Sequence, residues 1–260
     1  MPALAACGNE VSLRILEHLL QRIAVTPAID EPFSHIYLEQ VFPEDIYEQM
    51  LCHFPDPKLY QPAAERHYNT GRDQFVRSMY LLTPAKLTCL PSEQQECWRA
   101  VAAALTAPEL KQAMYAKLGK DLAFRYSVHQ SHAGELAGYS RPTLYRETAG
   151  FEIPPHPDTR KKIVTMQLYL PRDHSQLDLG TALYKRKLLG WPLGTWHQRF
   201  QKVKQFPFQP NSGYAFVVNN KLTRKSWHGR ERLPAGAGVR NTLLNTFYET
   251  PREGFAGYLA

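Results

Sequence analysis

The sequence contains no run of about eighteen apolar residues, the length at which a membrane-spanning helix would be predicted. Residues 1–14, MPALAACGNEVSLR, also lack the basic start and the long apolar stretch of a secretory signal peptide. We therefore expect a cytoplasmic protein that has no membrane partner.

Cysteine is also scarce, with four residues in a chain of 260. None of them stands in the Cys-x-x-Cys spacing of zinc and redox sites, and a chain of this length needs no disulfide framework to stabilise it. We expect Cys7, Cys52, Cys89 and Cys97 to be reduced and mostly buried, and we expect no zinc site built on them.

Acidic residues are too few to balance the basic ones, and the formal net charge is +7. The basic residues are scattered, however, and their densest groups, at 160–162, 185–187 and 221–225, lie in no recognisable nucleic-acid-binding motif. A solvated surface is the simplest interpretation, and we expect no nucleic-acid partner. The expected partner is a small-molecule substrate, for which an anionic compound is one alternative. The sequence indicates no oligomeric state.

The chain is long enough for one domain with a single sizeable core. Helical periodicity and capping signals predict helices over residues 11–23, 43–54, 91–106 and 107–118. From residue 122 onward, short β-branched and aromatic runs predict strands over residues 124–128, 143–147, 163–170, 181–184, 214–218 and 242–248. Strands this short favour an antiparallel sandwich or barrel. We expect a helical supporting region over residues 1–121 and a β core over 122–250, within one domain spanning 1–260.

Residues 185–212 carry many aromatic and basic side chains without a clear period. A long insertion in a compact fold is more often a lid or a binding loop than idle chain. We expect Trp191, Trp196 and Phe200 to pack such a lid, and the sequence does not separate a hydrophobic cover from direct stacking on a substrate.

A histidine and a carboxylate stand two residues apart in the segment IPPHPDT, where His156 and Asp158 precede a predicted strand. In an extended backbone, residues i and i+2 project to the same side, so both side chains can reach one metal ion. Pro155 and Pro157 restrict the backbone here and lower the entropy that is lost on ordering it. This is the geometry that two ligands of a facial triad require.

His228, in the later segment SWHG, is available as a third ligand. Two imidazoles and one carboxylate on one face of an octahedron leave three open positions, which is the arrangement of non-haem iron(II) oxygenases. Arg240 follows at the start of the last predicted strand, where its guanidinium can grip a distal carboxylate in two parallel hydrogen bonds. The Thr242 hydroxyl can add a third.

Each of these residues has an ordinary interpretation when it is taken alone. His156 would be a surface histidine in a proline-rich loop, and Asp158 would be a turn residue. His228 would be a core histidine bonded to a backbone carbonyl, and Arg240 would be an exposed ion-pair partner of small energetic value. Their joint order and spacing favour the metal site.

Other histidines offer weaker alternatives. His129 and His132 have a spacing that suits one helical face, but the segment HQSHAGELAG is a poor helix signal, so we interpret both as loop histidines. His174 and His197 have no partner at ligand spacing.

Taken together, the segments HPD, WHG and RNT resemble the HxD…H…RxS/T pattern of the iron(II)/2-oxoglutarate-dependent dioxygenase superfamily. The run LYRETAGF at residues 144–151 resembles the prolyl-hydroxylase-like branch, and the resemblance covers roughly residues 122–250. It implies a double-stranded β-helix, a jelly-roll or cupin-like core of mainly β structure, whose larger sheet is supported by N-terminal helices.

The resemblance also implies roles for particular residues. The implied ligands of iron(II) are His156, Asp158 and His228. Arg240 and Thr242 would bind the C5 carboxylate of 2-oxoglutarate, the co-substrate that is consumed together with O2. Either Tyr145 or Arg146 would also reach the co-substrate, and the sequence leaves that choice open. Thr rather than Ser at position 242 and the basic aromatic insertion depart from the prolyl-hydroxylase pattern, which puts the substrate in doubt.

The implied activity is that of an oxidoreductase, a hydroxylase that oxidises an unactivated C–H bond and releases succinate and CO2. A small or carrier-linked metabolite is the expected substrate. A prolyl or other protein side chain is one alternative, and a non-catalytic cupin-like binding protein is an alternative of another class. Asp158 argues against halogenation, because the related halogenases carry a small residue in its place. Desaturation and demethylation stay open beside hydroxylation.

Overall fold

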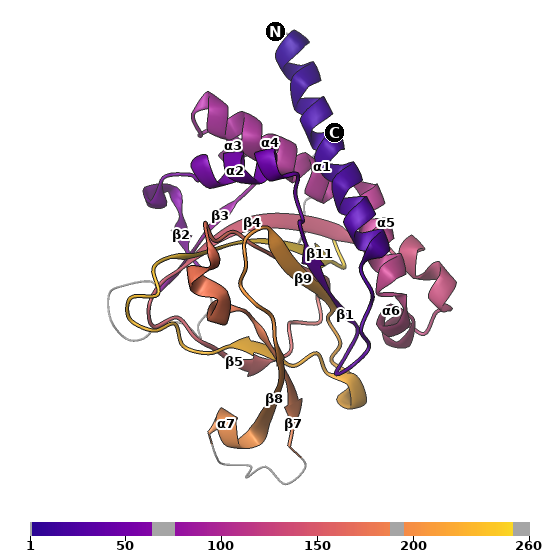
Figure 1. The fold of residues 1–260 in the computed structure, drawn as a ribbon. Helices are drawn as coiled ribbons and strands as arrows, with labels where there is room; N and C mark the ends of the chain where they lie inside the picture. The colour runs from indigo at the N-terminus through magenta and orange to yellow at the C-terminus, as the bar shows by residue number, and fades with distance from the viewer. Residues whose placement is uncertain (1, 64–75, 188–194, 252–260) are drawn as a thin grey trace.

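The computed structural model describes residues 2–63, 76–187 and 195–251, with side-chain surroundings from residue 10 onward. Two antiparallel sheets face each other, and helices cover the outer face of the larger one (Figure 1). The larger sheet has the strand order β1-β9-β6-β11-β4-β3-β2, and the smaller sheet has the order β5-β10-β7-β8. A cavity lined by residues of both sheets lies between them.

The strands of the larger sheet are β1 (His35–Glu39), β2 (Gln61–Pro62), β3 (Arg77–Leu81), β4 (Tyr139–Glu147), β6 (Lys162–Tyr169), β9 (Ser212–Val217) and β11 (Arg240–Tyr248). Those of the smaller sheet are β5 (Ile153–His156), β7 (Ala182–Arg186), β8 (Phe200–Gln205) and β10 (His228–Arg230). From β4 to β11 the chain changes sheet at every step except the β7–β8 hairpin. This alternation makes a jelly roll, the double-stranded β-helix, so the predicted fold class is confirmed.

Four helices, α1 (Pro2–Val25), α2 (Glu44–Cys52), α4 (Ser92–Thr106) and α5 (Pro108–Lys117), pack over the outer face of the larger sheet (Figure 1). Trp98 of α4 and Leu243 of β11 are fully buried in the main core that results. Asn245 of β11 donates a hydrogen bond to the Leu105 backbone oxygen in α4 at 2.8 Å. The other described helices are α3 (Pro84–Leu87), α6 (Gly119–Tyr126), α7 (Trp196–Arg199) and the 3-10 turns η1 (Pro57–Leu59), η2 (Gln130–Glu135), η3 (His174–Leu179) and η4 (Leu222–Arg224).

Side chains of the larger sheet alternate between this core and the space between the sheets, because neighbouring residues of a strand project to opposite faces. On β4, Leu144 packs into the main core, whereas Tyr145 lines the cavity. The space between the sheets also holds an aromatic cluster, made of Phe33, Tyr169, Phe206, Phe208, Tyr214 and Phe216. The cavity is therefore enclosed by two packed layers.

One predicted strand is wrong. Residues 124–128 belong instead to helix α6 and its cap, and Ser127 ends the helix with a left-handed φ of 57°. The helix buries Leu122 and Asp121, and Asp121 accepts a hydrogen bond from Arg224 at 2.5 Å. These distant contacts outweigh the local strand propensity of the segment, which is a weak preference.

The predicted burial of the cysteines is also wrong for most of those that the structure describes. Cys52 and Cys89 are exposed free thiols, and Cys97 is partly buried. Cys7 lies outside the residues whose side chains are described. Cys52 is the last residue of α2, and its exposure places this end of the helix at the protein surface.

The insertion at 185–212 forms regular structure where it is described. It contains α7 and β8, and β8 pairs with β7 at the edge of the smaller sheet. Trp196 donates a hydrogen bond to Glu152 at 3.0 Å, and the Phe200 ring packs 4.7 Å from that of Trp227. Neither Trp196 nor Phe200 lines the cavity, and Trp191 lies outside the described residues. The role of this segment as a lid stays a prediction.

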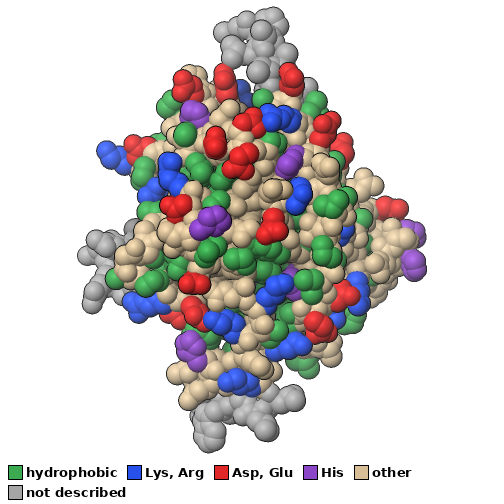
Figure 2. Space-filling model, viewed as in Figure 1, with side chains coloured by type: hydrophobic (Ala, Val, Ile, Leu, Met, Phe, Trp, Pro, Cys, Tyr) green, Lys and Arg blue, Asp and Glu red, His purple; other side chains and the backbone are tan. Residues whose placement is uncertain are grey.

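Basic and acidic side chains are interspersed on the face seen in Figure 2, which agrees with a solvated surface. Within the described ranges, no helix has the length and apolar character needed to cross a membrane. The cytoplasmic location and the boundary at residue 121 stay predictions. Strands β1 to β3, which precede that boundary, extend the larger sheet.

Candidate metal and anion site

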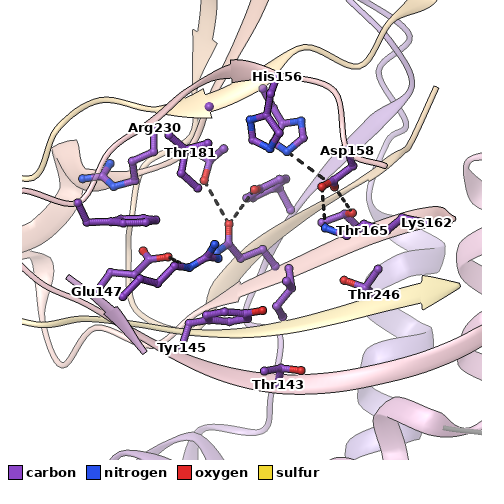
Figure 3. Close-up of a pocket in the computed structure, with 18 of the residues that line it drawn as sticks. Thr143, Tyr145, Glu147, His156, Asp158, Lys162, Thr165, Thr181, Arg230 and Thr246 are labelled. Atoms are coloured by element: carbon purple, nitrogen blue, oxygen red, sulfur yellow. Dashed lines mark hydrogen bonds and ion pairs between the residues drawn. The ribbon is translucent and has the colours of Figure 1, made fainter. Parts of the chain in front are cut away.

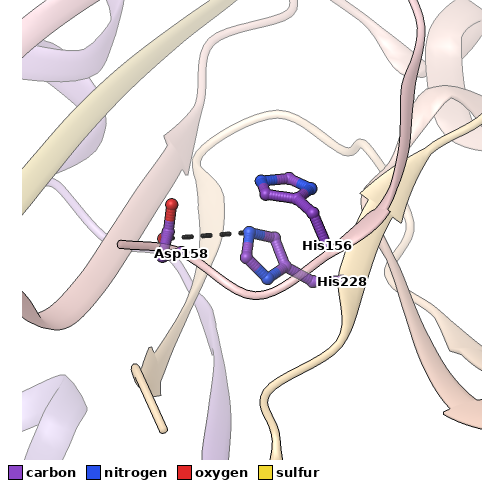
Figure 4. Close-up of side chains that lie close together, drawn as sticks. All are labelled: His156, Asp158 and His228. Carbon is purple, nitrogen blue, oxygen red and sulfur yellow. Dashed lines mark ion pairs between the residues drawn. The ribbon is translucent and has the colours of Figure 1, made fainter. Parts of the chain in front are cut away.

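Three side chains with metal-binding atoms meet between the sheets, those of His156, Asp158 and His228 (Figure 4). One ligand atom from each lies within 4.8 Å of the others. The centroids of the two imidazole rings are 4.5 Å apart, and His228 Nε2 lies 3.8 Å from Asp158 Oδ2. Among the residues that the structure describes, no other group of three His, Cys, Asp or Glu could share an ion.

The pairing of β5 with β10 brings the two histidines together. His228, the first residue of β10, is the register partner of His156, the last residue of β5. Gly229 permits this close approach, because a Cβ at that position would lie 2.6 Å from the backbone oxygen of Ile153. Asp158 follows two residues after His156, so one short segment supplies two of the three groups.

Both imidazole rings are oriented by backbone carbonyl groups. His156 Nδ1 lies 3.0 Å from the Pro154 oxygen, and His228 Nδ1 lies 2.9 Å from the Ser226 oxygen. A carbonyl oxygen only accepts, so Nδ1 of each ring donates, and in a neutral ring Nε2 then keeps a lone pair. Burial, followed by the neighbouring His156, lowers the pKa of His228 to about 4. The His228 imidazole is therefore neutral at pH 7, the form that binds a metal.

Asp158 is buried and ionised. Burial on its own would raise the pKa of Asp158, but the charge of Lys162, followed by the two histidines, holds that pKa below its ordinary value. Lys162 Nζ donates to Asp158 Oδ1 at 2.6 Å, and the Thr165 hydroxyl donates to Oδ2 at 2.7 Å. Each carboxylate oxygen thus has one fixed donor and keeps lone pairs for a metal ion.

The triad lines a cavity of about 120 Å³ (Figure 3). One buried water needs roughly 10–15 Å³ of such space, so the cavity has room for a small molecule. Figure 3 shows Glu147 and Arg230 at one side of the cavity, and Asp158, Lys162 and Thr246 at the other. We call the first side the distal end and the second the triad end.

Arginine side chains gather around one carboxylate at the distal end. Glu147, which is 1% exposed, pairs with Arg240 Nη1 and, at 3.1 Å, with Arg77 Nε. Arg230 also lines the cavity there and donates to the Gly180 backbone oxygen at 3.1 Å. Burial, followed by the charge of Arg240, lowers the pKa of Arg230 to about 9, so the guanidinium stays charged at pH 7. The described residues of the distal end thus comprise three cations and one anion, a surplus of positive charge within the part of the chain that the structure describes.

Two buried donors at the distal end have no hydrogen-bond partner in the described part of the chain, Nη2 of Arg240 and Nε of Arg230. A buried donor without an acceptor costs roughly 1–3 kcal/mol, so such groups usually mark a missing acceptor. A carboxylate fits this place, because its two oxygens can accept from two guanidinium groups and its charge offsets the surplus. The distal end therefore has the chemistry of an anion site.

Of the residues predicted to bind the co-substrate, Arg240 and Tyr145 line the cavity. Thr242 does not line the cavity: it is fully buried, and its hydroxyl accepts from Nε2 of Gln167, which does line it, at 3.2 Å. Arg146 projects to the other face of the sheet and stacks 5.6 Å from the Tyr60 ring. Neighbouring residues of a strand project to opposite faces of the sheet, so of Tyr145 and Arg146, between which the sequence left the choice open, only Tyr145 faces the cavity.

Sequence reasoning missed several residues of the cavity wall, namely Arg77, Glu147, Lys162, Thr165 and Arg230. Arg230 could have been found, because it stands two residues after His228 in an extended segment and so projects to the same side. Arg77 carries no such signal, since β3 joins β4 from a distant part of the sequence.

The remaining predicted histidine positions lie apart from the cavity. His129 caps the turn η2 and His132 lies within it, and both side chains are exposed, with their ring centroids 6.1 Å apart. His174 begins η3 and His197 stacks on Trp196, and neither lines the cavity.

Comparison with known proteins finds no protein-family model and no curated protein that matches the chain. Solved structures similar to it include a Pseudomonas putida prolyl-4-hydroxylase, 15% identical over 90% of this chain and 99% of that one, with a TM-score of 0.48. A prolyl 4-hydroxylase from Phytophthora capsici is 17% identical over 95% and 67%, with a TM-score of 0.48. The non-haem α-ketoglutarate-dependent epimerase SnoN from nogalamycin biosynthesis is 12% identical over 90% and 82%, with a TM-score of 0.46. Similarities this weak assign neither a family nor an activity.

Proposed function

We propose that this protein is an iron(II)- and 2-oxoglutarate-dependent oxygenase that hydroxylates a C–H bond of a small molecule. One observation carries the proposal. A triad of two imidazoles and one carboxylate lies at one end of a cavity whose other end presents two buried, unpartnered guanidinium donors. A metal ion and a carboxylate group are the ligands that these two ends would take.

The donor set supports iron(II) as the metal. Two neutral imidazoles and one carboxylate form the facial triad of non-haem iron(II) oxygenases, which keeps three positions open for other ligands. His156, Asp158 and His228 would hold the ion, and the carbonyl contacts of both Nδ1 atoms would keep Nε2 directed at it.

The arginine cluster supports a carboxylated co-substrate. Arg240 and Arg230 would bind the distal carboxylate of 2-oxoglutarate through their unpartnered donors, and Tyr145 would lie alongside it. Glu147 fixes the Arg240 side chain in place beforehand, because it holds Nη1 while the Leu179 backbone oxygen accepts from Nε at 2.8 Å. Such preorganisation lowers the entropy lost on binding.

When bound, iron(II), 2-oxoglutarate and O2 supply the oxidising power that breaks a C–H bond. The overall reaction converts R–H, O2 and 2-oxoglutarate into R–OH, succinate and CO2. This chain keeps Asp158 ionised and His228 neutral, and its aromatic cluster excludes water from one side of the cavity. The cavity of about 120 Å³ favours a small metabolite as substrate over a side chain that is still attached to the backbone of another protein.

The direct test is the visible absorption band that an iron(II)–2-oxoglutarate complex gives without oxygen. Wild-type protein should give the band, and His156→Ala should abolish it. Arg240→Ala should weaken the binding of 2-oxoglutarate by about ten- to a hundred-fold, the loss of affinity expected when charge-assisted hydrogen bonds are removed, and it should retain metal binding. His132→Ala, at an exposed histidine, should leave the band unchanged.

Succinate release then tests catalysis. A screen of small metabolites with the iron-loaded protein should find a compound that raises succinate release above the metal-free control. Failure of the wild-type protein to form the band would refute the proposal. A normal band in His156→Ala would refute the assigned ligands.

A further inference from the structure

Two of the three densest basic groups of the sequence meet at a second pocket, which the proposed function does not use. Arg160 belongs to the group at residues 160–162, and Lys221 begins the group at 221–225. The pocket has a volume of about 370 Å³, and it is lined by Arg125, Tyr126, Arg160, Asn219, Asn220, Lys221 and Glu249. None of these residues lines the cavity between the sheets. The pocket is therefore a separate place on the molecule.

This pocket adjoins the segments that carry the metal triad. Asn220 Nδ2 donates to the Asp158 backbone oxygen at 3.0 Å. The Asn219 backbone NH donates to the Ser226 hydroxyl at 3.0 Å, and the Ser226 backbone oxygen orients the His228 ring. A ligand in the pocket would thus contact residues that support two of the three metal-binding side chains from outside the cavity.

The hydrogen bonds of Arg125 hold the pocket together. Its Nη1 donates to the backbone oxygens of Lys162, at 2.6 Å, and of Val218. Its Nη2 donates to the Arg160 backbone oxygen and to Glu249 Oε1, both at 2.6 Å. The charge of Arg125 is compensated by that of Glu249, so this arginine fixes the segments around the pocket and is not needed to bind a ligand.

Three other side chains have donors to offer. Asn219 is fully buried, and its Oδ1 accepts from the Lys221 backbone NH at 2.9 Å, which sets the orientation of the amide. Nδ2 of this amide has no hydrogen-bond partner among the described residues, and a buried donor of this kind usually marks a missing acceptor. Lys221 Nζ donates to the Phe124 backbone oxygen, which uses one of its three protons. The exposed Arg160 guanidinium pairs with no acidic side chain in the described part of the chain.

The charge at the pocket fits a dianion. Arg125, Arg160 and Lys221 are cationic and Glu249 is anionic, which leaves a surplus of two positive charges among the described lining residues. A phosphate group carries a charge of about −1.5 to −2 at pH 7 and has three strong acceptor oxygens. A carboxylate would compensate one charge only, and it has two oxygens for donors that come from three side chains.

We propose that this pocket is a second ligand site, which binds a phosphate group through Asn219 Nδ2, Arg160 and Lys221. The group is either free phosphate or the phosphate of a small ester, since both present the same oxygens. The site requires neither the metal ion nor 2-oxoglutarate. The inference therefore goes beyond the proposed function and does not depend on it.

Isothermal titration calorimetry of the full-length, metal-free protein tests the site in a buffer that contains no phosphate. At about pH 8 the two phosphate probes, inorganic phosphate and glycerol 3-phosphate, are mainly dianions, and acetate serves as the carboxylate probe. Wild-type protein should bind at least one phosphate probe at least about ten-fold more tightly than acetate. The tighter of the two phosphate probes shows whether the group arrives as the free ion or as an ester.

Substitutions in two of the basic groups provide a matched comparison. Arg160→Gln should weaken phosphate binding by about ten- to a hundred-fold, because a charge-assisted hydrogen bond is lost. Arg186→Gln makes the same change of charge at another exposed arginine, outside the pocket, and should leave phosphate binding unchanged. Asn219→Asp keeps the acceptor for the Lys221 NH but replaces the unpartnered donor with a carboxylate oxygen, so it should abolish phosphate binding. Both arginines are exposed, so their comparison still decides the matter if Asn219→Asp does not fold.

Three results would overturn the inference. Wild-type protein that binds neither phosphate probe, or that binds acetate as tightly as phosphate, has no phosphate site. Wild-type affinity in Arg160→Gln places the anion elsewhere. Affinity that is lost in Arg240→Ala but kept in Arg160→Gln assigns the phosphate to the distal end of the cavity. The proposed function fails separately, by absence of the iron–2-oxoglutarate band, and the calorimetry of metal-free protein is unaffected by that outcome.

Discussion

Replacement of Glu147 by glutamine should destabilise the ligand-free protein, because this carboxylate compensates two buried guanidinium groups. Glu147 is 1% exposed and pairs with Arg77 and Arg240. Removing one partner of a buried ion pair costs about 3–5 kcal/mol, since the remaining charge loses its compensation but not its burial. Glutamine keeps one acceptor oxygen and nearly the same volume, so a packing defect contributes little to this cost.

The expected change in melting temperature follows from the size of the chain. An unfolding entropy of about 2.1 cal/mol/K per residue gives about 0.55 kcal/mol/K for 260 residues. A loss of about 3–5 kcal/mol therefore lowers the melting temperature by about 5–9 °C. Differential scanning calorimetry of the metal-free protein measures this shift directly.

A matched control is available at the surface. Glu231 pairs with Lys202 at 2.8 Å, but both side chains are 40% exposed or more. Exposed pairs contribute about 0–1 kcal/mol, so Glu231→Gln should lower the melting temperature by less than about 2 °C. Equal shifts in the two variants would refute the reasoning, since burial of the arginine cluster would then have no energetic consequence.

The same variant also reports on the anion site. Glu147→Gln leaves the distal end with one more uncompensated positive charge. Addition of 2-oxoglutarate and metal should therefore raise the melting temperature of Glu147→Gln by more degrees than it raises that of the wild type. A smaller rise in the variant would mean that Glu147 positions the arginines more than it competes with the ligand.

Three further predictions test other parts of the structure. Burial and the neighbouring imidazole lower the pKa of His228 from 6.5 to about 4. The metal-free protein should therefore have its full stability above pH 6.5 and lose about 3 kcal/mol of it by pH 4, because the unfolded chain binds a proton that the folded state excludes. In a calorimetric series over this pH range His228→Gln should lose less stability than the wild type, and an identical dependence on pH would contradict the assignment. Burial raises the pKa of Cys97 to about 12, so iodoacetamide at pH 8 should label Cys52 and Cys89 before Cys97, as peptide mass spectrometry would record, and early labelling of Cys97 would show that its surroundings open readily. Gly229→Ala should separate β5 from β10 and weaken metal binding at least ten-fold in a competition assay with a chelator, whereas wild-type affinity would show that the strands can shift to accept a Cβ.

Local spacing was sufficient to predict that His156 and Asp158 lie together, whereas strands β5 and β10, which carry the two histidines, were not among the predicted strands. His156 and Asp158 stand two residues apart in an extended segment, and the fold places their side chains together as that period requires. Arg240 was predicted from its place at the start of the last strand, and it lines the cavity. The strand at 124–128 was wrong, because helix α6 is fixed by contacts such as Asp121 to Arg224 that no local window contains.

The partners of these residues could not be predicted in the same way. Lys162 reaches Asp158 only because the chain turns between them, and Arg77 reaches Glu147 because β3 pairs with β4. The contact of Arg77 with Glu147 depends on the sheet register, which a single sequence does not specify without the hydrophobic pattern of the partner strand. The choice between Tyr145 and Arg146 was of the same kind, since a shift of one residue exchanges the two faces.

The contact of Lys162 with Asp158 gives the protein a resident counter-ion. Burial lowers the pKa of Lys162, but the charge of Asp158 more than offsets this, so the ammonium group is retained beside the carboxylate. In structural zinc domains the metal supplies the folding energy, and chelation unfolds the chain. Here the carboxylate is neutralised by the protein itself, so the jelly roll can form first and take up its ion afterwards. We therefore expect metal loss and reloading to be a reversible exchange within a folded molecule.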